Sequence, residues 1–154
     1  MPTTIDVVTV IAAAPAVVFD LELDMDLHAA SLPGEVARAG SGRPRLELGD
    51  EVRFAARHFG LMWRVTCRIT ALDRPHRFVD EQFRGPFRTM RHEHVFEALD
   101  TGCTRMSDRM RITAPGGAAG SVIARLILAP YLRRLLVRRA AHIRYVAEAG
   151  AHGG

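Results

Sequence analysis

The sequence predicts an α+β fold, in which a twisted antiparallel sheet of about six strands surrounds a long C-terminal helix and two short helices follow the first strand. Three observations predict it. Residues 3–11 alternate with period two and are rich in β-branched side chains, which is typical of a strand. Residues 50–112 contain apolar alternations separated by turn signals, which predict five further strands in a meander. From Ser121 to about Glu148, apolar residues recur at helical spacing.

The two short helices are predicted from the residues that follow the first strand. Ala14-Pro15 precedes apolar residues at helical spacing, and proline suits the first turn of a helix. A second helix is predicted over Asp24–Ser31, ended by Pro33-Gly34. The segment from there to Gly49, rich in glycine, proline and arginine, is predicted to be a loop.

The C-terminal helix follows the breaker Pro115–Gly120. Pro130 lies within it, and a proline there removes a hydrogen bond and clashes with the preceding turn. We therefore expect a kink or break near Leu128. Arg139 falls within the apolar stripe of the helix, which comprises Leu128, Leu132, Leu135, Leu136, Ile143 and Val146.

Composition limits the class of protein. A chain of 154 residues with 48% apolar and 25% charged residues predicts one folded domain over residues 1–154. All 21 basic residues are arginines and they are spread along the chain, so no nucleic-acid partner is expected. Cys67 and Cys103 have no metal spacing and the N-terminus has no secretion signal, which favours a cytoplasmic location.

No apolar segment approaches the length of a membrane span, so stable membrane insertion is not expected. The arginines of the C-terminal helix would suit a helix lying on a membrane. The sheet requires the apolar side of that helix, however, so we assign these arginines to its solvated face. A homodimer is left open.

Strand alternation predicts which side chains face the helix. On the strands near residues 51–58 and 61–69, His58 shares a face with Val52, Phe54 and Ala56, and Trp63 shares one with Leu61, Val65, Cys67 and Ile69. Met90, His92 and His94 share a face with Phe96, and Asp108 lies between Met106 and Met110. The strand around Asp80 and Gln82 is ambiguous, because aromatic residues occur on both of its faces.

Five stretches carry a family resemblance: Ala56-Arg57-His58-Phe59-Gly60, Arg77-Phe78-Val79-Asp80-Glu81-Gln82, Gly85-Pro86-Phe87, His92-Glu93-His94-Val95-Phe96 and Thr104-Arg105-Met106-Ser107-Asp108. They resemble the SRPBCC superfamily, in particular its bacterial polyketide cyclase/dehydrase-like branch. The resemblance implies the helix-grip fold of START-like domains, and it favours Asp80 and Gln82 on the inner face. That fold serves binders, carriers and enzymes, so it implies no single activity.

The inner face would therefore carry polar groups among apolar neighbours, which is costly unless those groups are paired or hydrated. A ligand cavity explains this arrangement, and Arg139 is expected to pair with a buried carboxylate, Asp108 or Asp80. The predicted ligand-binding residues are His58, Trp63, Asp80, Gln82, Met90, His92, His94, Asp108, Leu135 and Arg139.

The leading hypothesis is a binding protein for a small hydrophobic or aromatic molecule, polyketide-like or lipid-like. The alternative is a polyketide cyclase or dehydratase, with His92, His94 and Asp108 as candidate catalytic residues. An accessory subunit that docks on a larger enzyme is a third reading. His92-x-His94 has a familiar metal spacing, but no third ligand is fixed by sequence, so we expect no metal and no cofactor.

Overall fold

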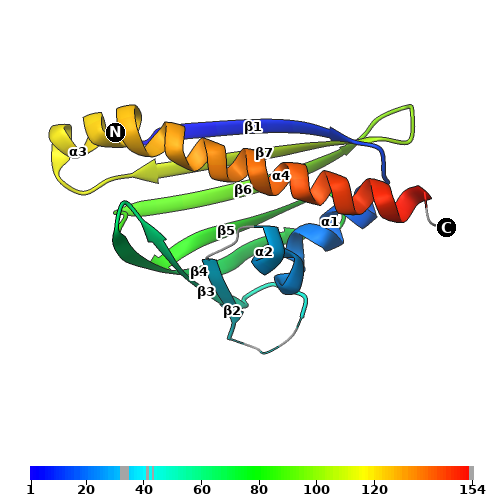
Figure 1. The fold of residues 1–154 in the computed structure, drawn as a ribbon, viewed down its shortest axis with the longest axis horizontal. Coiled ribbons are helices and arrows are strands. Elements are labelled where there is room, and N and C mark those ends of the chain that lie inside the picture. The colour runs from blue at the N-terminus through cyan, green and yellow to red at the C-terminus, as the bar shows by residue number, and fades with distance from the viewer. Residues whose placement is uncertain (32–34, 41, 43, 153–154) are drawn as a thin grey trace.

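In the part of the chain that the structure describes, a single antiparallel sheet of seven strands carries the fold, in the order β1-β7-β6-β5-β4-β3-β2. The computed structural model describes residues 1–31, 35–40, 42 and 44–152. The long C-terminal helix lies along the sheet, and two short helices pack near its C-terminal end (Figure 1). The strands are β1 (Thr3–Ile11), β2 (Glu35–Ala39), β3 (Glu51–His58), β4 (Leu61–Asp73), β5 (Arg77–Arg84), β6 (Thr89–Ala98) and β7 (Thr104–Thr113), and the helices are α1 (Pro15–Leu23), α2 (Met25–Ser31), α3 (Gly117–Ile123), η1 (Ala124–Leu128) and α4 (Ala129–His152).

The predicted fold class is confirmed, with one strand more than expected. β2 lies in the segment predicted to be a loop and pairs antiparallel with β3 at the edge of the sheet. Its five residues, Glu35–Ala39, alternate weakly, and the surrounding glycine, proline and arginine residues obscured that pattern. The predicted stop at Pro33-Gly34 lies outside the described residues.

The predicted inward faces of β6 and β7 are confirmed. His92, His94 and Phe96 are buried in β6, and Met106 and Asp108 are buried in β7. Side chains alternate faces along a strand, and the two strands pair in register, so their inner faces form one continuous surface. Leu61 differs from the prediction, because it lies exposed at the tip of the β3–β4 hairpin.

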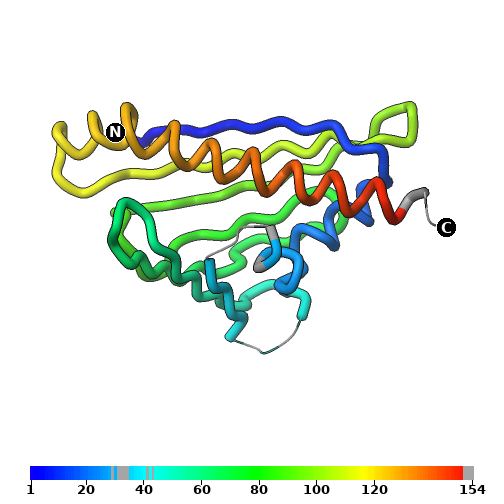
Figure 2. Tube along the Cα trace, viewed as in Figure 1, coloured from blue at the N-terminus to red at the C-terminus, as the bar shows by residue number. Residues whose placement is uncertain are grey.

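The C-terminal helix begins at Gly117, four residues before the predicted start. Gly116 adopts a left-handed conformation with a φ of 93° and precedes the helix, while Gly120 packs so closely against the Pro115 carbonyl that no Cβ would fit. Instead of a break near Leu128, a π-helical turn, η1, accommodates Pro130, and the trace runs on as one coil (Figure 2). Among the described residues, no helix has the length and apolarity needed to cross a membrane.

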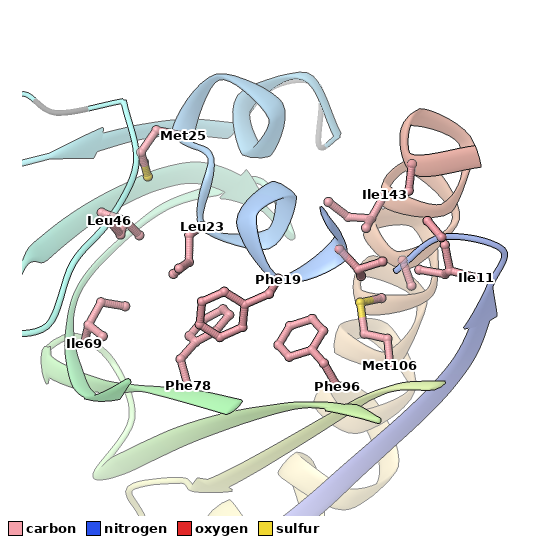
Figure 3. Close-up of a cluster of buried hydrophobic side chains, with 14 of the residues drawn as sticks. Ile11, Phe19, Leu23, Met25, Leu46, Ile69, Phe78, Phe96, Met106 and Ile143 are labelled. Carbon is pink, nitrogen blue, oxygen red and sulfur yellow. The ribbon is translucent and has the colours of Figure 1, made fainter. Parts of the chain in front are cut away.

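The main hydrophobic core lies where α1 packs between the sheet and α4. Phe19 of α1 is fully buried, and its ring meets Phe78 and Phe96 edge-on at centroid distances of 5.6 and 5.3 Å. Ile143 brings α4 onto the same cluster (Figure 3). Burial of such large side chains is the main driving force of folding, so α1 fixes this end of the molecule.

Candidate functional site

A cavity of about 410 Å³ lies between the inner face of the sheet and α4. Its walls are largely apolar, and the predicted residues Trp63, Met90 and Leu135 belong to them. The predicted residues His58, Asp80, His92, His94 and Arg139 also line it. Eight of the ten predicted residues therefore meet at one cavity, because the strand register and the helix stripe were read correctly.

Gln82 and Asp108 do not line the cavity. The Gln82 amide donates to the Phe87 carbonyl at 2.7 Å and accepts from the Phe87 N–H at 3.2 Å, so it holds the β5–β6 turn. Gly85 leaves room for this side chain, since a Cβ there would lie 2.4 Å from Gln82 Oε1. Asp108 is buried in β7 behind the two histidines rather than facing the cavity directly.

His94 is held between two carboxylates. Its Nε2–H donates to Asp80 Oδ2 at 3.0 Å, and its Nδ1 lies 2.8 Å from Asp108 Oδ1. Burial opposes the charged imidazolium, but the contacts with Asp108 and Asp80 outweigh it and raise the pKa of His94 to about 9. His94 is therefore a fixed cation at neutral pH.

The two aspartates are affected in the opposite direction. Burial opposes their charged forms, yet His94 hydrogen-bonds Asp80, and both histidines contact Asp108, so the pKa of each carboxyl lies below its usual range. Both are therefore carboxylates at neutral pH. Asp80, His94 and Asp108 form a charged triad, of which Asp80 and His94 line the cavity and Asp108 lies behind them.

His92 differs from His94 in its surroundings. Its ring lies 3.8 Å from that of His94, and its Nε2 is 3.3 Å from Asp108 Oδ1. It is buried and lines the cavity, and its Nε2 makes no aligned hydrogen bond to any described residue. A buried imidazole of this kind can exchange a hydrogen bond or a proton with a bound molecule.

Arg139 has a different partner from the one predicted. It reaches Glu22 of α1, with Nη2 3.0 Å from Glu22 Oε2 and also donating to the Glu22 carbonyl at 3.0 Å. The prediction of Asp108 or Asp80 was wrong because the histidines already occupy those carboxylates. Glu22 also lies 3.7 Å from His94, so the Arg139–Glu22 pair adjoins the triad.

Glu22 was missed by sequence reasoning, although a signal was present. It lies four residues after Val18, and residues at that spacing share one face of a helix. Both side chains are buried. An acidic residue on the buried face of a short helix requires a partner. Here the partner is Arg139, which is far away in the sequence.

Other polar residues that the sequence did not single out also line the cavity. His28 and Glu35 join α2 to β2, with His28 Nε2 2.9 Å from Glu35 Oε1. Burial, together with Arg139, lowers the pKa of His28. Burial raises the pKa of the Cys67 thiol, so the thiol remains protonated beside Asp80.

At its other end the cavity is bordered by a contact between the β3–β4 hairpin and α4. His58 Nδ1 hydrogen-bonds the Tyr131 hydroxyl, and the Phe59 ring packs on Tyr131 at 4.7 Å. The Trp63 indole donates to the His58 carbonyl at 2.8 Å. Phe59 adopts a left-handed φ of 55°, which is rare for a bulky residue. These contacts link the tip of the β3–β4 hairpin to α4.

Among the residues that the structure describes, two overlapping sets of side chains have the spacing of metal ligands. Asp80, His92 and His94 form one set, and Glu22, His94 and Asp108 the other, with ligand atoms within 4.8 Å of one another in each. In the first set a metal would replace the hydrogen bond that His94 makes to Asp80. The expectation that no metal is bound stays a prediction.

Comparisons with known proteins agree with this architecture. The family model described as "Polyketide cyclase / dehydrase and lipid transport" matches residues 2–146. No curated protein sequence matches the chain.

Solved structures share the fold at low sequence identity. The Zhui aromatase/cyclase from Streptomyces sp. R1128 superposes with a TM-score of 0.78 at 19% identity, covering 96% of this chain and 94% of that one. A protein from Thermus thermophilus gives 0.75 at 16% identity, covering 94% and 99%. The major latex-like protein 151 of Panax ginseng gives 0.71 at 12% identity, covering 95% and 97%. At these identities the likeness shows the fold alone.

Proposed function

Because the chain belongs to the polyketide cyclase/dehydrase and lipid transport family, we propose that it binds a small, largely apolar or aromatic molecule between the sheet and α4. The observation that carries this proposal is the cavity of about 410 Å³, which combines apolar walls with one buried polar cluster. Small-molecule sites typically have this composition, in which apolar walls provide affinity and a few polar groups fix orientation.

The positions of the lining residues suggest how the ligand lies. Trp63, Met90 and Leu135 offer apolar surface to its body. His92 and Asp80 line the same cavity as polar groups and would receive a hydrogen-bonding group, such as a hydroxyl, a carbonyl or an N–H, at one end of the molecule.

Filling the cavity should therefore abolish binding. Val65 lines the cavity on β4, and Val65→Trp places an indole where the ligand would lie. We expect the affinity for the apolar fluorescent probe N-phenyl-1-naphthylamine to fall by about tenfold or more, which is the effect of losing a few apolar contacts. Fluorescence titration measures this change, and native mass spectrometry of the unmodified protein would identify a retained ligand.

Val8→Trp is the matched control, since Val8 lies on β1 with its side chain exposed. It should bind the probe as the wild type does. A folded Val65→Trp protein with undiminished affinity would place the probe outside this cavity and contradict the proposal.

A second candidate function is cyclisation or dehydration of a polyketide-like substrate. The observation that favours it is the His92–Asp108 pair, because His92 lines the cavity with Asp108 behind it at 3.3 Å. A carboxylate behind an imidazole orients the ring and stabilises its protonated form. In a dehydration, His92 would take the proton from the carbon next to a carbonyl while the neighbouring hydroxyl leaves, and both would depart together as water.

His92→Gln tests this candidate, because glutamine retains a polar side chain but cannot act as the base. Given a synthetic poly-β-keto thioester, we expect the wild type to form a dehydrated aromatic product and the variant to lose about 100-fold or more in rate. Product formation is followed by ultraviolet absorbance and mass spectrometry. Equal rates in the two proteins, or no turnover by either, would leave binding as the function.

A further inference from the structure

An apolar collar lies at one end of the molecule. It is formed by the β3–β4 hairpin and by the helical segment α3–η1, which are far apart in sequence. The side chains of this collar are all exposed, although they are large and hydrophobic. Isolated exposed apolar residues are ordinary, but a group of them on neighbouring elements marks an interaction site. The collar consists of Phe59, Leu61 and Met62 on the β3–β4 hairpin and Val122, Ile123, Leu126 and Ile127 on α3 and η1.

The collar surrounds the point where the cavity reaches the surface. Of the residues that line the cavity, Phe59, Pro115 and Ile123 are exposed, whereas the other lining residues are buried or partly buried. The contact of Phe59 with Tyr131 at 4.7 Å holds the hairpin against α4. In Figure 1 the β3–β4 hairpin and α3 lie at the same end of the molecule.

The charge around the collar is of one sign. No aspartate or glutamate occurs between Glu51 and Asp73, or between Asp108 and Glu148, and these stretches contain four and eight arginines. Arg57, Arg64 and Arg125 are exposed on the elements that carry the collar. Their guanidinium groups form no ion pair with the carboxylates of the described residues. The collar is therefore apolar with a cationic margin.

We propose that this collar docks reversibly on an anionic lipid surface, so that an apolar ligand passes between the bilayer and the cavity. Apolar side chains enter the interface between headgroups and acyl chains, while nearby arginines attract anionic headgroups. An apolar molecule that leaves the bilayer there enters the cavity without crossing water. Docking of this kind needs no membrane-spanning segment. The transfer step rests on the proposed function, whereas docking itself does not.

A lipid surface fits these observations better than an acidic protein does. The collar projects from the tip of a hairpin and from a helix segment, so its apolar residues stand out from the molecule. The Leu126 and Ile127 side chains are 66% and 53% exposed. Protruding side chains of this kind can insert into a lipid interface, because lipid molecules rearrange around them. A protein partner would need pockets that match them in shape.

Vesicle sedimentation tests the proposal. We expect the wild-type protein to sediment with vesicles containing about one third phosphatidylglycerol in phosphatidylcholine, and to do so less as salt is raised. The double variant Leu126→Glu/Ile127→Glu should bind these vesicles about tenfold or more weakly, because two carboxylates would enter an anionic interface. Val8→Glu/Val10→Glu, on exposed positions of β1, should bind as the wild type does.

Titration with N-phenyl-1-naphthylamine in solution separates the two proposals. Neither Leu126 nor Ile127 lines the cavity, so the collar variant should keep the wild-type affinity for this probe. If the collar variant loses vesicle binding but still binds the probe, the docking proposal is supported. If the wild-type protein does not bind the probe, the proposed ligand-binding function is contradicted, but docking is not. The docking proposal is overturned if the wild-type protein does not bind anionic vesicles, or if the β1 variant binds them as weakly as the collar variant does. It is also overturned if sedimentation velocity shows that the wild type is a dimer and that Leu126→Glu/Ile127→Glu is a monomer.

Discussion

Arg139→Leu should lower the free energy of unfolding by about 3 to 5 kcal/mol, because it removes the guanidinium that contacts the buried carboxylate of Glu22 and leaves only the more distant imidazole of His94, at 3.7 Å. Glu22 is almost completely inaccessible, and Arg139 contacts both its carboxylate and its backbone carbonyl at 3.0 Å. For a chain of this length, such a loss lowers the melting temperature by about 6 to 20 °C. Differential scanning calorimetry at neutral pH measures it.

Two further variants isolate the cause. Arg138→Leu removes a neighbouring arginine that is exposed on α4, and it should change the melting temperature little. Glu22→Leu in the Arg139→Leu background replaces the pair with apolar side chains and should recover much of the lost stability. If Arg139→Leu leaves the melting temperature unchanged but weakens binding of an acidic ligand, Arg139 is a ligand-binding residue and the structural role is excluded.

Raising the pH from 6.5 to 9 should lower the free energy of unfolding by about 2 to 3 kcal/mol, because His94 must lose its proton between its carboxylate partners. Its pKa rises from 6.5 to about 9 on folding. A group whose pKa is raised on folding contributes its full stabilisation at pH values below its pKa in the unfolded chain. This stabilisation is lost as the pH rises through its pKa in the folded protein. Urea unfolding at several pH values measures this slope.

Of the other shifted groups in the cavity, the Cys67 thiol affects stability only at the upper end of this range, because its ordinary pKa is 9.0 and burial raises it. The others act below the range. His28 has a lowered pKa in the folded protein, so it reduces stability only as the pH falls below its ordinary pKa of 6.5. Asp108 also has a lowered pKa, and it reduces stability only in acid, below its ordinary pKa of 3.8. His94→Gln should therefore be less stable than the wild type but should show little slope between pH 6.5 and 9. A wild-type protein whose stability is constant over that range would contradict the assignment of His94 as a cation.

The order of most elements and the faces of the long strands were predictable from sequence, because both depend on local periodicity. Met90, His92 and His94 alternate along one strand, and side chains two residues apart must share a face. The long helix was likewise evident from its apolar stripe, although its start was placed at Ser121 rather than Gly117. The short edge strand β2 was missed, because five residues among loop-forming neighbours carry too little periodicity to predict it.

The pairing within the polar cluster was decided by the tertiary structure alone. The sequence indicated that Asp80, His94, Asp108 and Arg139 face inward, but it gave no means of choosing among their partners. Glu22 became the partner of Arg139 because α1 packs against the end of the sheet, a placement fixed by the burial of Phe19 rather than by any polar residue. Periodicity is a property of neighbours along the chain and can be read from sequence, whereas an ion pair between residues 117 positions apart exists only after the core has brought the two segments together.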